Sequence, residues 1–561
     1  MTSRGTLTFV VGISGHRDIP KPLLPLIKEH VSAQLQQIKA NFSSLPVEVV
    51  CGLAEGADTL VAEVALELGM AVRAVLPMPI SDYEEDFSED GLATFRRLIN
   101  TDEIVVEELP LSDSSKLDRD SQYLMLKDYL VRRSNVLMAL WDGVANQLPG
   151  GTSDVALSYL TGSSGSGVQK VTRESTLGDD GNLVISIFSP REWSDDADGQ
   201  VGFEYLMSEG APGCIASLLD FPRKVSDRWV GFERYASERF SDNAKDIVSY
   251  DFFVPEDAEH SPNFEQLNGE FVRADQLAIA NQTRSDFLFR SFGLMAGSMG
   301  LFFLIYAKLS SSNVYLVAYL VLFSVGYVLF RASRDRAWFS KHLAYRAFAE
   351  TIRIRYFLEL AGRGHSTSIE DRLKLMKVNR FNGLEWLYDA AKSVEPLPSA
   401  HMFSRDIAAV TKRWVEDQSG YFKTKVHQLH HEHERLEMIK HLLFIGSFFG
   451  TLALIFFKKD LYHLNVMATD GKTFLVFLMG LLPLWLALWE LYQGKMAVRE
   501  LAWQYSNQAL LFSEASRRLE TLENEDAKLT IIEELADTSL IEALQWTVHR
   551  FHRDHEPPTA G

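Results

Sequence analysis

Cysteine is almost absent from this chain, with only Cys51 and Cys214 among 561 residues. Two cysteines cannot form a disulfide framework, and they favour a reducing compartment. The Cys-x-x-Cys spacing of a zinc ribbon is missing too, so no metal site of that kind is expected. Basic residues are outnumbered, because 56 Lys and Arg against 75 Asp and Glu give a net charge of −19. Nucleic-acid affinity comes mainly from neutralised phosphate, so no nucleic-acid partner is expected.

Two nucleotide-binding patterns are also missing. The absence of Gly-x-Gly-x-x-Gly argues against ordinary NAD-dependent hydride transfer. The absence of the full Gly-x-x-x-x-Gly-Lys-Ser/Thr loop argues against ATPase chemistry. No apolar leader precedes the first expected strand, which predicts that there is no signal peptide.

Four long runs contain no Asp, Glu, Lys or Arg. They cover residues 291–307, 309–330, 441–457 and 473–489. A bilayer core of about 30 Å needs about 20 apolar residues, with about 17 as the lower limit. These runs predict four transmembrane helices in two hairpins, with spans at about 291–307, 313–330, 441–457 and 473–489. The alternative is a pair of buried helical hairpins in a large soluble protein.

Basic residues around the first hairpin predict its orientation. Seven flank its outer ends, against Lys308 alone beside the connecting turn; they are Arg273, Arg284, Arg290, Arg331, Arg334, Arg336 and Lys341. The positive-inside rule then places both ends of the hairpin in the cytoplasm. The second hairpin has lysines in its loop, so its orientation follows from the even number of spans. The prediction is a multi-pass membrane protein with both termini cytoplasmic.

The first third of the chain alternates short β-branched runs with helical stretches. The expected strands are Thr6–Ile13, Val47–Cys51, Val72–Leu76, Val105–Leu109, Val136–Trp141 and Leu183–Phe188. This alternation, with nearly continuous apolar strands, predicts an α/β fold with a Rossmann-like, doubly wound parallel sheet. Ligands of such sheets bind beyond the carboxyl ends of the strands.

Small and polar residues gather at those expected strand ends. Glycines let backbone N–H groups approach a phosphate, and helix N-termini favour anions. Arg17 is suited to bidentate pairing with phosphate, and carboxylates are suited to ribose hydroxyls or an exocyclic amine. The candidate ligand-binding residues are Gly12, Ser14, Gly15, His16, Arg17, Gly52, Glu55, Gly56, Ala57, Asp58, Pro77, Asp142, Gly143, Gly150, Gly151, Thr152 and Asp154.

Residues 5–195 resemble the SLOG superfamily of Rossmann-like domains, which is related to the LOG phosphoribohydrolases, DprA and the N-terminal region of TRPM channels. The runs that carry this resemblance are GISGHRD, VVCGLAEGADTLVAEVALELG, VLPMPISDYEEDF and LMALWDGVANQLPGGTSDVAL. The first hairpin and the helix with YRAFAETIR resemble the SLATT-type membrane domains that accompany SLOG domains in bacterial conflict systems. The resemblance implies a sensor for a nucleotide-derived second messenger, with a nucleotide or ADP-ribose-type ligand, and a membrane effector.

One departure from the LOG pattern bears on chemistry. LOG enzymes carry Pro-Gly-Gly-x-Gly-Thr-x-x-Glu, in which the Glu assists N-glycosidic cleavage. Here the Glu position is Val155, and Asp154 sits one residue early, a rotation of about 100° on a helix. This favours binding without turnover, so no catalytic residue is assigned.

The expected organisation has six parts. They are a nucleotide-binding domain at 1–195, a connector of unclear fold at 196–272, a first membrane hairpin with a cytoplasmic helix at 273–362, a cytoplasmic helical linker at 363–425, a second hairpin with a cytoplasmic helix at 426–530, and a C-terminal helix and tail at 531–561.

Two polar clusters have alternative interpretations. The acidic run Asp82–Asp86 could hold a metal, but a solvated helix start is favoured. His427 and His431 have the i, i+4 spacing of a metal pair, but a polar helix face near the membrane is favoured. No metal is therefore expected.

The functional hypothesis is a membrane-anchored sensor and effector. Ligand binding would reorient the α/β domains and repack the spans within a homo-oligomer, which would permeabilise the inner membrane in anti-phage defence. No span carries an interior charge, which disfavours a transporter. Two alternatives remain. One is a membrane-tethered nucleotide N-glycosidase that uses Glu55 or Asp154 as its acid/base group, and the other is a membrane scaffold without a ligand.

Overall fold

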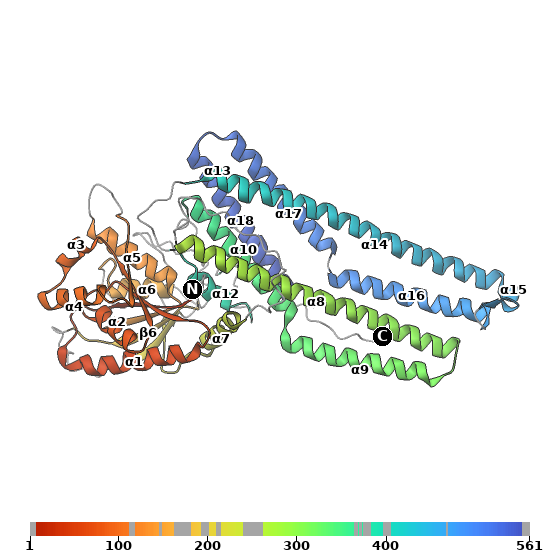
Figure 1. Cartoon of the computed structure of the whole chain (residues 1–561), viewed down its shortest axis with the longest axis horizontal. Coiled ribbons are helices and arrows are strands. Elements are labelled where there is room, and N and C mark those ends of the chain that lie inside the picture. The colour runs from red at the N-terminus through yellow and green to blue at the C-terminus, as the bar shows by residue number, and fades with distance from the viewer. Residues whose placement is uncertain are drawn as a thin grey trace. The chain divides into compact units, whose positions relative to one another are not determined.

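The computed structural model describes most of the chain as two compact units, whose elements are labelled in Figure 1. The first unit consists of Met1–Asp275, Ala347–Asp406 and Ala536–Val548, and the second of Gln276–Arg346, Ile407–Leu535 and His549–Gly561. The residues described are 7–111, 118–144, 148–161, 181–191, 201–208, 215–238, 262–363, 369, 373, 383–396, 405–466, 469–496 and 498–551.

An eight-stranded sheet forms the centre of the first unit. Its strands lie in the order β4-β3-β2-β1-β5-β6-β7-β8. Strands β1 to β6 are parallel, while β7 and β8 are antiparallel to their neighbours. The strands are β1 Phe9–Gly15, β2 Val47–Cys51, β3 Ala71–Leu76, β4 Ile104–Glu108, β5 Val136–Trp141, β6 Leu183–Phe188, β7 Phe203–Ser208 and β8 Ile215–Leu218.

The predicted parallel sheet is confirmed, but it is larger than expected. Residues 196–272, given only as a connector, contain β7, β8 and helix α7 (Arg223–Ser237). Strand β7 is partly exposed and mixes aromatic, apolar and charged residues. Its apolar run was therefore too short to stand out in the sequence. Thr6, the first residue of the expected strand Thr6–Ile13, lies outside the described residues.

Helices cover both faces of the sheet, because alternate strand residues point to opposite sides. Val10, Val50 and Val75 pack with residues of α5. Their neighbour Phe9 points the other way, where it stacks on Phe42 and contacts Trp229. The helices between the strands are α1 Leu24–Asn41, α2 Ala57–Glu67, α3 Ile80–Tyr83, α4 Glu89–Ile99, α5 Arg119–Arg133 and α6 Thr152–Thr161, with short 3₁₀ turns at Lys21–Leu23 and Glu84–Asp86.

A segment from far downstream completes this unit. Helix α12 (Trp386–Ser393) lies in the range expected to be a cytoplasmic linker, yet all eight of its residues are buried. It packs against α7, α5 and β1. Lys392 donates to the carbonyl of Ser134 at 2.8 Å and to Asn182 at 3.0 Å. Helix α12 contains Asp389, Lys392 and Ser393, so its sequence alone does not indicate that all of it is buried.

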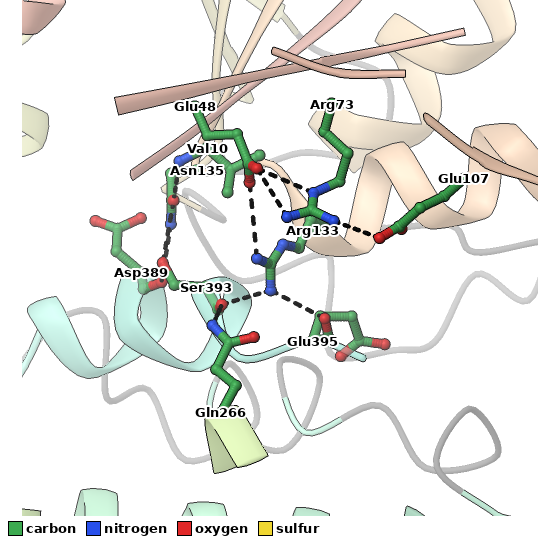
Figure 2. A network of polar contacts seen from close by, with 10 residues as sticks. All are labelled: Val10, Glu48, Arg73, Glu107, Arg133, Asn135, Gln266, Asp389, Ser393 and Glu395. Carbon is green, nitrogen blue, oxygen red and sulfur yellow. Dashed lines mark hydrogen bonds and ion pairs between the residues drawn. The ribbon is translucent and has the colours of Figure 1, made fainter. Parts of the chain in front are cut away.

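Polar side chains join α12 to the amino-terminal ends of the strands, in what we call the basal network (Figure 2). Arg133 donates to the carbonyl groups of Ser393 and Glu395, the latter at 2.9 Å. Asn135 donates to the carbonyl of Asp389 at 2.8 Å and accepts from the amide of Val10 at 2.8 Å. The network consists of Val10, Glu48, Arg73, Glu107, Arg133, Asn135, Gln266, Asp389, Ser393 and Glu395.

The second unit is built from long helices. Each predicted span lies within one of four helices that are long and apolar enough to cross a membrane. Helices α10 and α17 follow the second span of each pair. The helices that enter this unit are α8 Pro262–Lys308, α9 Asn313–Arg336, α10 Trp338–Leu360, α13 Ile407–Val410, α14 Asp417–Phe456, α15 Lys458–Tyr462, α16 Gly471–Met496, α17 Val498–Thr521 and α18 Glu525–Phe551, with a π-helical turn at Thr411–Glu416 and a two-stranded ladder of β9 Asn465–Val466 and β10 Thr469–Asp470.

The surfaces of these helices suit a bilayer. On α9, Val314, Val317 and Leu320 are 58–69% exposed. On α14, Leu442, Phe444 and several further aromatic residues are equally exposed. Apolar patches of this extent indicate contact with a membrane or a partner rather than with water. Four spans are therefore consistent with membrane association.

Glycines bring three of these helices close together. An ideal Cβ on Gly300 of α8 would lie 2.2 Å from Leu484 of α16. One on Gly450 of α14 would lie 2.3 Å from Met479, also on α16. Small residues permit such close approach between membrane helices. Helix α16 thus packs against both α8 and α14.

The buried ion pair between Arg228 and Asp389 yields a stability prediction. Arg228 Nε lies 2.6 Å from Asp389 Oδ2, and the two side chains are 4% and 0% exposed. Asp389→Ala leaves Arg228 buried without its carboxylate partner, so we expect a loss of about 3–5 kcal/mol in the free energy of unfolding. The measurement is urea unfolding of the detergent-solubilised full chain.

The control variant is Asp227→Ala, which breaks the exposed pair of Asp227 with Arg223. Exposed pairs contribute little, so the unfolding midpoint should hardly change. Equal effects of the two variants would contradict a structural role for the Arg228–Asp389 pair.

Candidate functional site

The candidate residues lie at the carboxyl edge of the parallel strands. The strand order reverses between β1 and β5, since β2 to β4 lie on one side of β1 and β5 to β8 on the other. Open α/β sheets bind ligands beyond such a reversal point. Gly15 ends β1, and Asp142 directly follows β5. The loop after β1, the β2–α2 loop and the β5–α6 loop therefore meet at one edge.

The end of β1 is tightly packed. An ideal Cβ on Gly15 would lie 2.2 Å from the Cβ of Ala57, and one on Gly12 would lie 2.0 Å from Ser134 Oγ. The carbonyl of His16 accepts from the amide of Ala57 at 3.0 Å. Ser14 is half-buried and shares a strand face with Gly12. Glycine at 15 thus lets α2 begin against β1.

The β2–α2 loop is held in an unusual conformation by Asp58. Its carboxylate accepts from the amides of Gly52 at 3.1 Å and Ala54 at 3.3 Å. Leu53 has φ +50° and Gly56 has φ +90°, in the region that favours glycine. An ideal Cβ on Gly56 would lie 2.3 Å from the carbonyl oxygen of Arg17. Such backbone conformations persist only where the surroundings enforce them.

Asp58 is a weaker acid than an ordinary aspartate, because it is buried. The side chain is 6% exposed. Burial raises the pKa of Asp58 to about 7, although the two amide hydrogen bonds and the charge of Arg17 act in the opposite direction. Its contacts are with the loop's own backbone, so Asp58 shapes the loop.

Glu55 connects this loop to the next helix. Its carboxylate accepts from the amide of Ser88 at 3.0 Å and from the Ser88 hydroxyl at 2.5 Å. Ser88 in turn caps α4 by accepting from the amide of Gly91 at 3.1 Å. Both carboxylate oxygens of Glu55 are thus used at a helix start, which argues against an acid/base role.

His16 and Asp142 face each other at the reversal point. The amide of Asp142 donates to His16 Nε2 at 3.2 Å. Burial lowers the pKa of His16, and the charge of Arg191 lowers it further. The same nitrogen lies 3.3 Å from Asp142 Oδ1, and this interaction acts in the opposite direction on the pKa of His16.

Asp142 is the carboxylate best suited to a ligand. Its side chain is 19% exposed and lies 3.2 Å from Arg191 Nε. Burial raises the pKa of Asp142, but hydrogen bonding to the Val144 amide and the His16 and Arg191 interactions outweigh burial and lower it. A charged, partly exposed carboxylate can accept from hydroxyl or amine donors. Gly143, with φ +74°, has open space around its Cβ position.

The glycine turn before α6 is held by Asp154. Its carboxylate accepts from the amide of Gly150 at 2.9 Å and from Lys127 at 3.1 Å. Gly151 follows, and Thr152 begins α6, so this helix N-terminus points toward the same edge as that of α2. Val155 is buried in an apolar cluster with Tyr159. Val155 therefore belongs to the core.

Helix α5 supplies contacts that the sequence analysis did not identify. Arg17 donates to Tyr123 Oη at 2.8 Å and to the carbonyl of Asp86 at 3.0 Å. Tyr123 donates to the Asp86 carboxylate. Burial raises the pKa of Tyr123 to about 12, and its bond to Asp86 contributes. The sequence signal that could have indicated these contacts is the acidic run Asp82–Asp86, followed by a helix that contains Arg119 and Tyr123.

Two more residues of α5 fix neighbouring loops. Arg119 donates to Asp86 at 2.6 Å and to Glu85 at 2.7 Å. Gln122 donates to the carbonyl of Pro77, at the end of β3. Glu84 is paired with Arg96. Arginine partners thus account for this acidic run.

No group of three possible metal ligands occurs among the described residues. His427, His430 and His431 are exposed on α14. The chain matches no family model, and a search of curated proteins found no relative. Its chemistry must therefore be argued from the geometry above.

Substitution of Gly56 tests the loop geometry. Gly56→Ala must place a Cβ against the Arg17 carbonyl at a φ of +90°, so we expect a loss of roughly 2–4 kcal/mol in stability and a displaced Arg17. Gly143→Ala is the matched control, because φ is also positive but no atom lies within 4 Å. It should cost only about 1–2 kcal/mol. Thermal unfolding of the full chain compares them, and equal losses would contradict the close approach.

The raised pKa of Asp58 predicts a pH dependence. In the unfolded chain Asp58 releases its proton near 3.8, but in the folded chain only near pH 7. The folded state therefore holds the proton more tightly, and the protein loses stability as pH rises from about 4 to about 7. Asp58→Asn cannot titrate, and its carbonyl oxygen can still accept from Gly52 and Ala54. We expect this variant to lose less stability than wild type over that range.

Melting temperatures at pH 5 and pH 8 provide the measurement. Glu89→Gln, which alters an exposed carboxylate on α4, serves as the control and should follow wild type. Parallel pH profiles for wild type and Asp58→Asn would be incompatible with the predicted titration.

Proposed function

We propose that this chain is a membrane-anchored sensor and effector, with a SLOG-like domain that binds a nucleotide-derived messenger. The observation that carries the proposal is the meeting of two glycine-containing turns, before α2 and before α6, at the β1/β5 reversal point. Each turn leads into a helix N-terminus, where backbone amides favour phosphate. Arg17 supplies a guanidinium at the same edge, and Asp142 supplies a carboxylate for a ribose or amine.

The same contacts favour binding over cleavage. Glu55 and Asp154 were the two candidates for an acid/base group. Glu55 is bound to Ser88, and Asp154 is bound to Lys127 and Gly150. Val155, at the LOG glutamate position, is 2% exposed within the core. The site therefore supports a Rossmann-like receptor whose ligand, of nucleotide or ADP-ribose type, leaves unchanged.

The membrane part supports an effector role. Four apolar helices with exposed side chains suit a lipid bilayer, the second partner in this proposal. Four spans are few for a pore, so several copies assemble as a homo-oligomer. SLATT-like hairpins, cytoplasmic termini and an inner-membrane location complete the proposal. Ligand binding repacks the spans and permeabilises the membrane in anti-phage defence, because the ligand binds one state better than the other.

A nucleotide panel on the detergent-solubilised full chain tests the proposal. The panel contains ADP-ribose and its derivatives, cyclic mononucleotides and cyclic oligonucleotides. A ligand at a hundred times its dissociation constant should add about 2.7 kcal/mol of stability. Arg17→Ala should weaken binding at least about tenfold, since charge-assisted bonds contribute roughly 1.5–3 kcal/mol. Arg96→Ala, which breaks an exposed pair, is the control and should bind normally.

Chromatography of the recovered ligand separates the alternatives. Intact ligand, together with ligand-dependent dye release from proteoliposomes, supports a sensor and effector. Cleaved ligand would instead make the protein a membrane-tethered enzyme. Stabilisation by no member of the panel would favour a scaffold.

A further inference from the structure

Helix α5 contacts the candidate site at one end and the basal network at the other. Near its start, Tyr123 accepts from Arg17, and Lys127 donates to Asp154. At its end, Arg133 donates to the carbonyl groups of Ser393 and Glu395. Tyr123 and Arg133 are ten residues apart, about 15 Å along a helix axis. One rigid element therefore joins both regions.

The site end of α5 touches loops from three strands. Tyr123 contacts the loop after β1, through Arg17. An ideal Cβ on Gly150 would lie 2.9 Å from the Cβ of Tyr123, so the turn before α6 packs directly on this helix. Gln122 holds the end of β3 through the Pro77 carbonyl. A ligand that draws Arg17 away from Tyr123, or widens the Gly150 turn, must therefore act on α5.

The other end of α5 contacts residues 393–395, which in turn contact α10. Arg132 Nη1 lies 4.0 Å from the Glu395 carboxylate, and Arg355 also pairs with Glu395. Arg355 belongs to α10, which begins two residues after α9 ends at Arg336. Figure 2 shows Arg133 between Glu48 and the backbone of Ser393 and Glu395. Through Glu395, the basal network thus reaches α10, which is separated from α9 only by Ala337, a residue with φ +50°.

The chemistry of this contact suits a transmitting element. Arg133 is 5% exposed and binds carbonyl groups in a fixed geometry rather than through a flexible apolar contact. Both bonds come from Arg133 Nη1, so a shift that breaks them leaves this buried nitrogen without its carbonyl partners. A small shift of α5 is therefore costly unless residues 393–395 move with it. Packed elements of this kind shift as bodies rather than deform continuously.

We propose that α5 is the coupling element of this protein, which transmits occupancy of the Arg17 site to the α12 segment and α10. The inference rests on the proposed function in taking the Arg17 edge as the ligand site. It assigns a regulatory role to Tyr123, Arg132 and Arg133 as positioning residues. Coupling between the two ends is reciprocal, because a change at either end must affect the other by the same free energy.

Amide hydrogen exchange on the full chain in detergent, without any nucleotide, tests this coupling. Tyr123→Phe keeps the ring against Gly150 but removes the hydroxyl that joins Arg17 to Asp86. We expect exchange at residues 386–395 to rise about fivefold or more. Arg133→Lys keeps the charge but removes Nη1, which donates to both carbonyl groups, and Nη2, which faces Glu48. It should raise exchange at residues 148–154 by a similar factor.

Leu35→Ala is the control for general destabilisation. Leu35 is fully buried on α1, whose neighbour Phe42 lies on the sheet face opposite α5. If Arg133→Lys does not fold, Arg132→Ala disturbs the same end from a partly exposed position and carries the same expectation. Remote changes no larger than those in Leu35→Ala would overturn the proposal, and so would changes confined to the mutated end.

The outcome is separable from that of the nucleotide panel. Nucleotide binding together with purely local exchange effects would overturn the role of α5 and leave the proposed function intact. Reciprocal remote effects, together with a nucleotide panel in which no member binds, would support the role of α5 and contradict the proposed ligand.

Discussion

The hydrogen bonds from Arg133 to the backbone of Ser393 and Glu395 join two parts of the chain some 260 residues apart. Without them, the buried Nη1 of Arg133 would lose both of its carbonyl partners. Removing the partner of a buried charged group is costly, because the charge is then left uncompensated away from water. The position of α12, and with it the closure of the sheet on this side, depends on this contact and on the Arg228–Asp389 pair.

At the carboxyl edge of the sheet, backbone conformation rather than buried charge determines the geometry. Leu53 and Gly56 have positive φ, and Gly15 lies close to Ala57. Carboxylates such as Asp58, Glu55 and Asp154 act mainly on their own loops and on α4. Arg17 and Asp142 lie at the same edge with part of their side chains exposed, although Arg17 is bound to Tyr123 and Asp142 to Arg191. A receptor needs such an arrangement, since a loop ordered in advance loses little entropy when a ligand binds.

Much of this fold could be predicted from the sequence, because strands, spans and turns depend on residues that are close together in the chain. Apolar strands such as Val47–Cys51 and Val136–Trp141, and the uncharged runs within α8, α9, α14 and α16, follow from composition and periodicity. Glycine turns marked the strand ends for the same reason. The role of Tyr123 could not be predicted, because it arises from a contact 106 residues away in sequence. The burial of α12 could not be predicted either, because its partners are distant in sequence and charged residues such as Asp389 and Lys392 are typical of solvent-exposed helices.

The sequence position of α12 has a consequence for biosynthesis. The ribosome makes the strands of the sheet first, then α8, α9 and α10, and only then the residues that satisfy Arg133, Asn135 and Arg228. The nascent α/β region therefore emerges with charged groups that still await their partners. The apolar helices α8 and α9 are therefore made before the region upstream of them can be completed. Completion of the α/β region thus has to wait for the synthesis of both apolar helices.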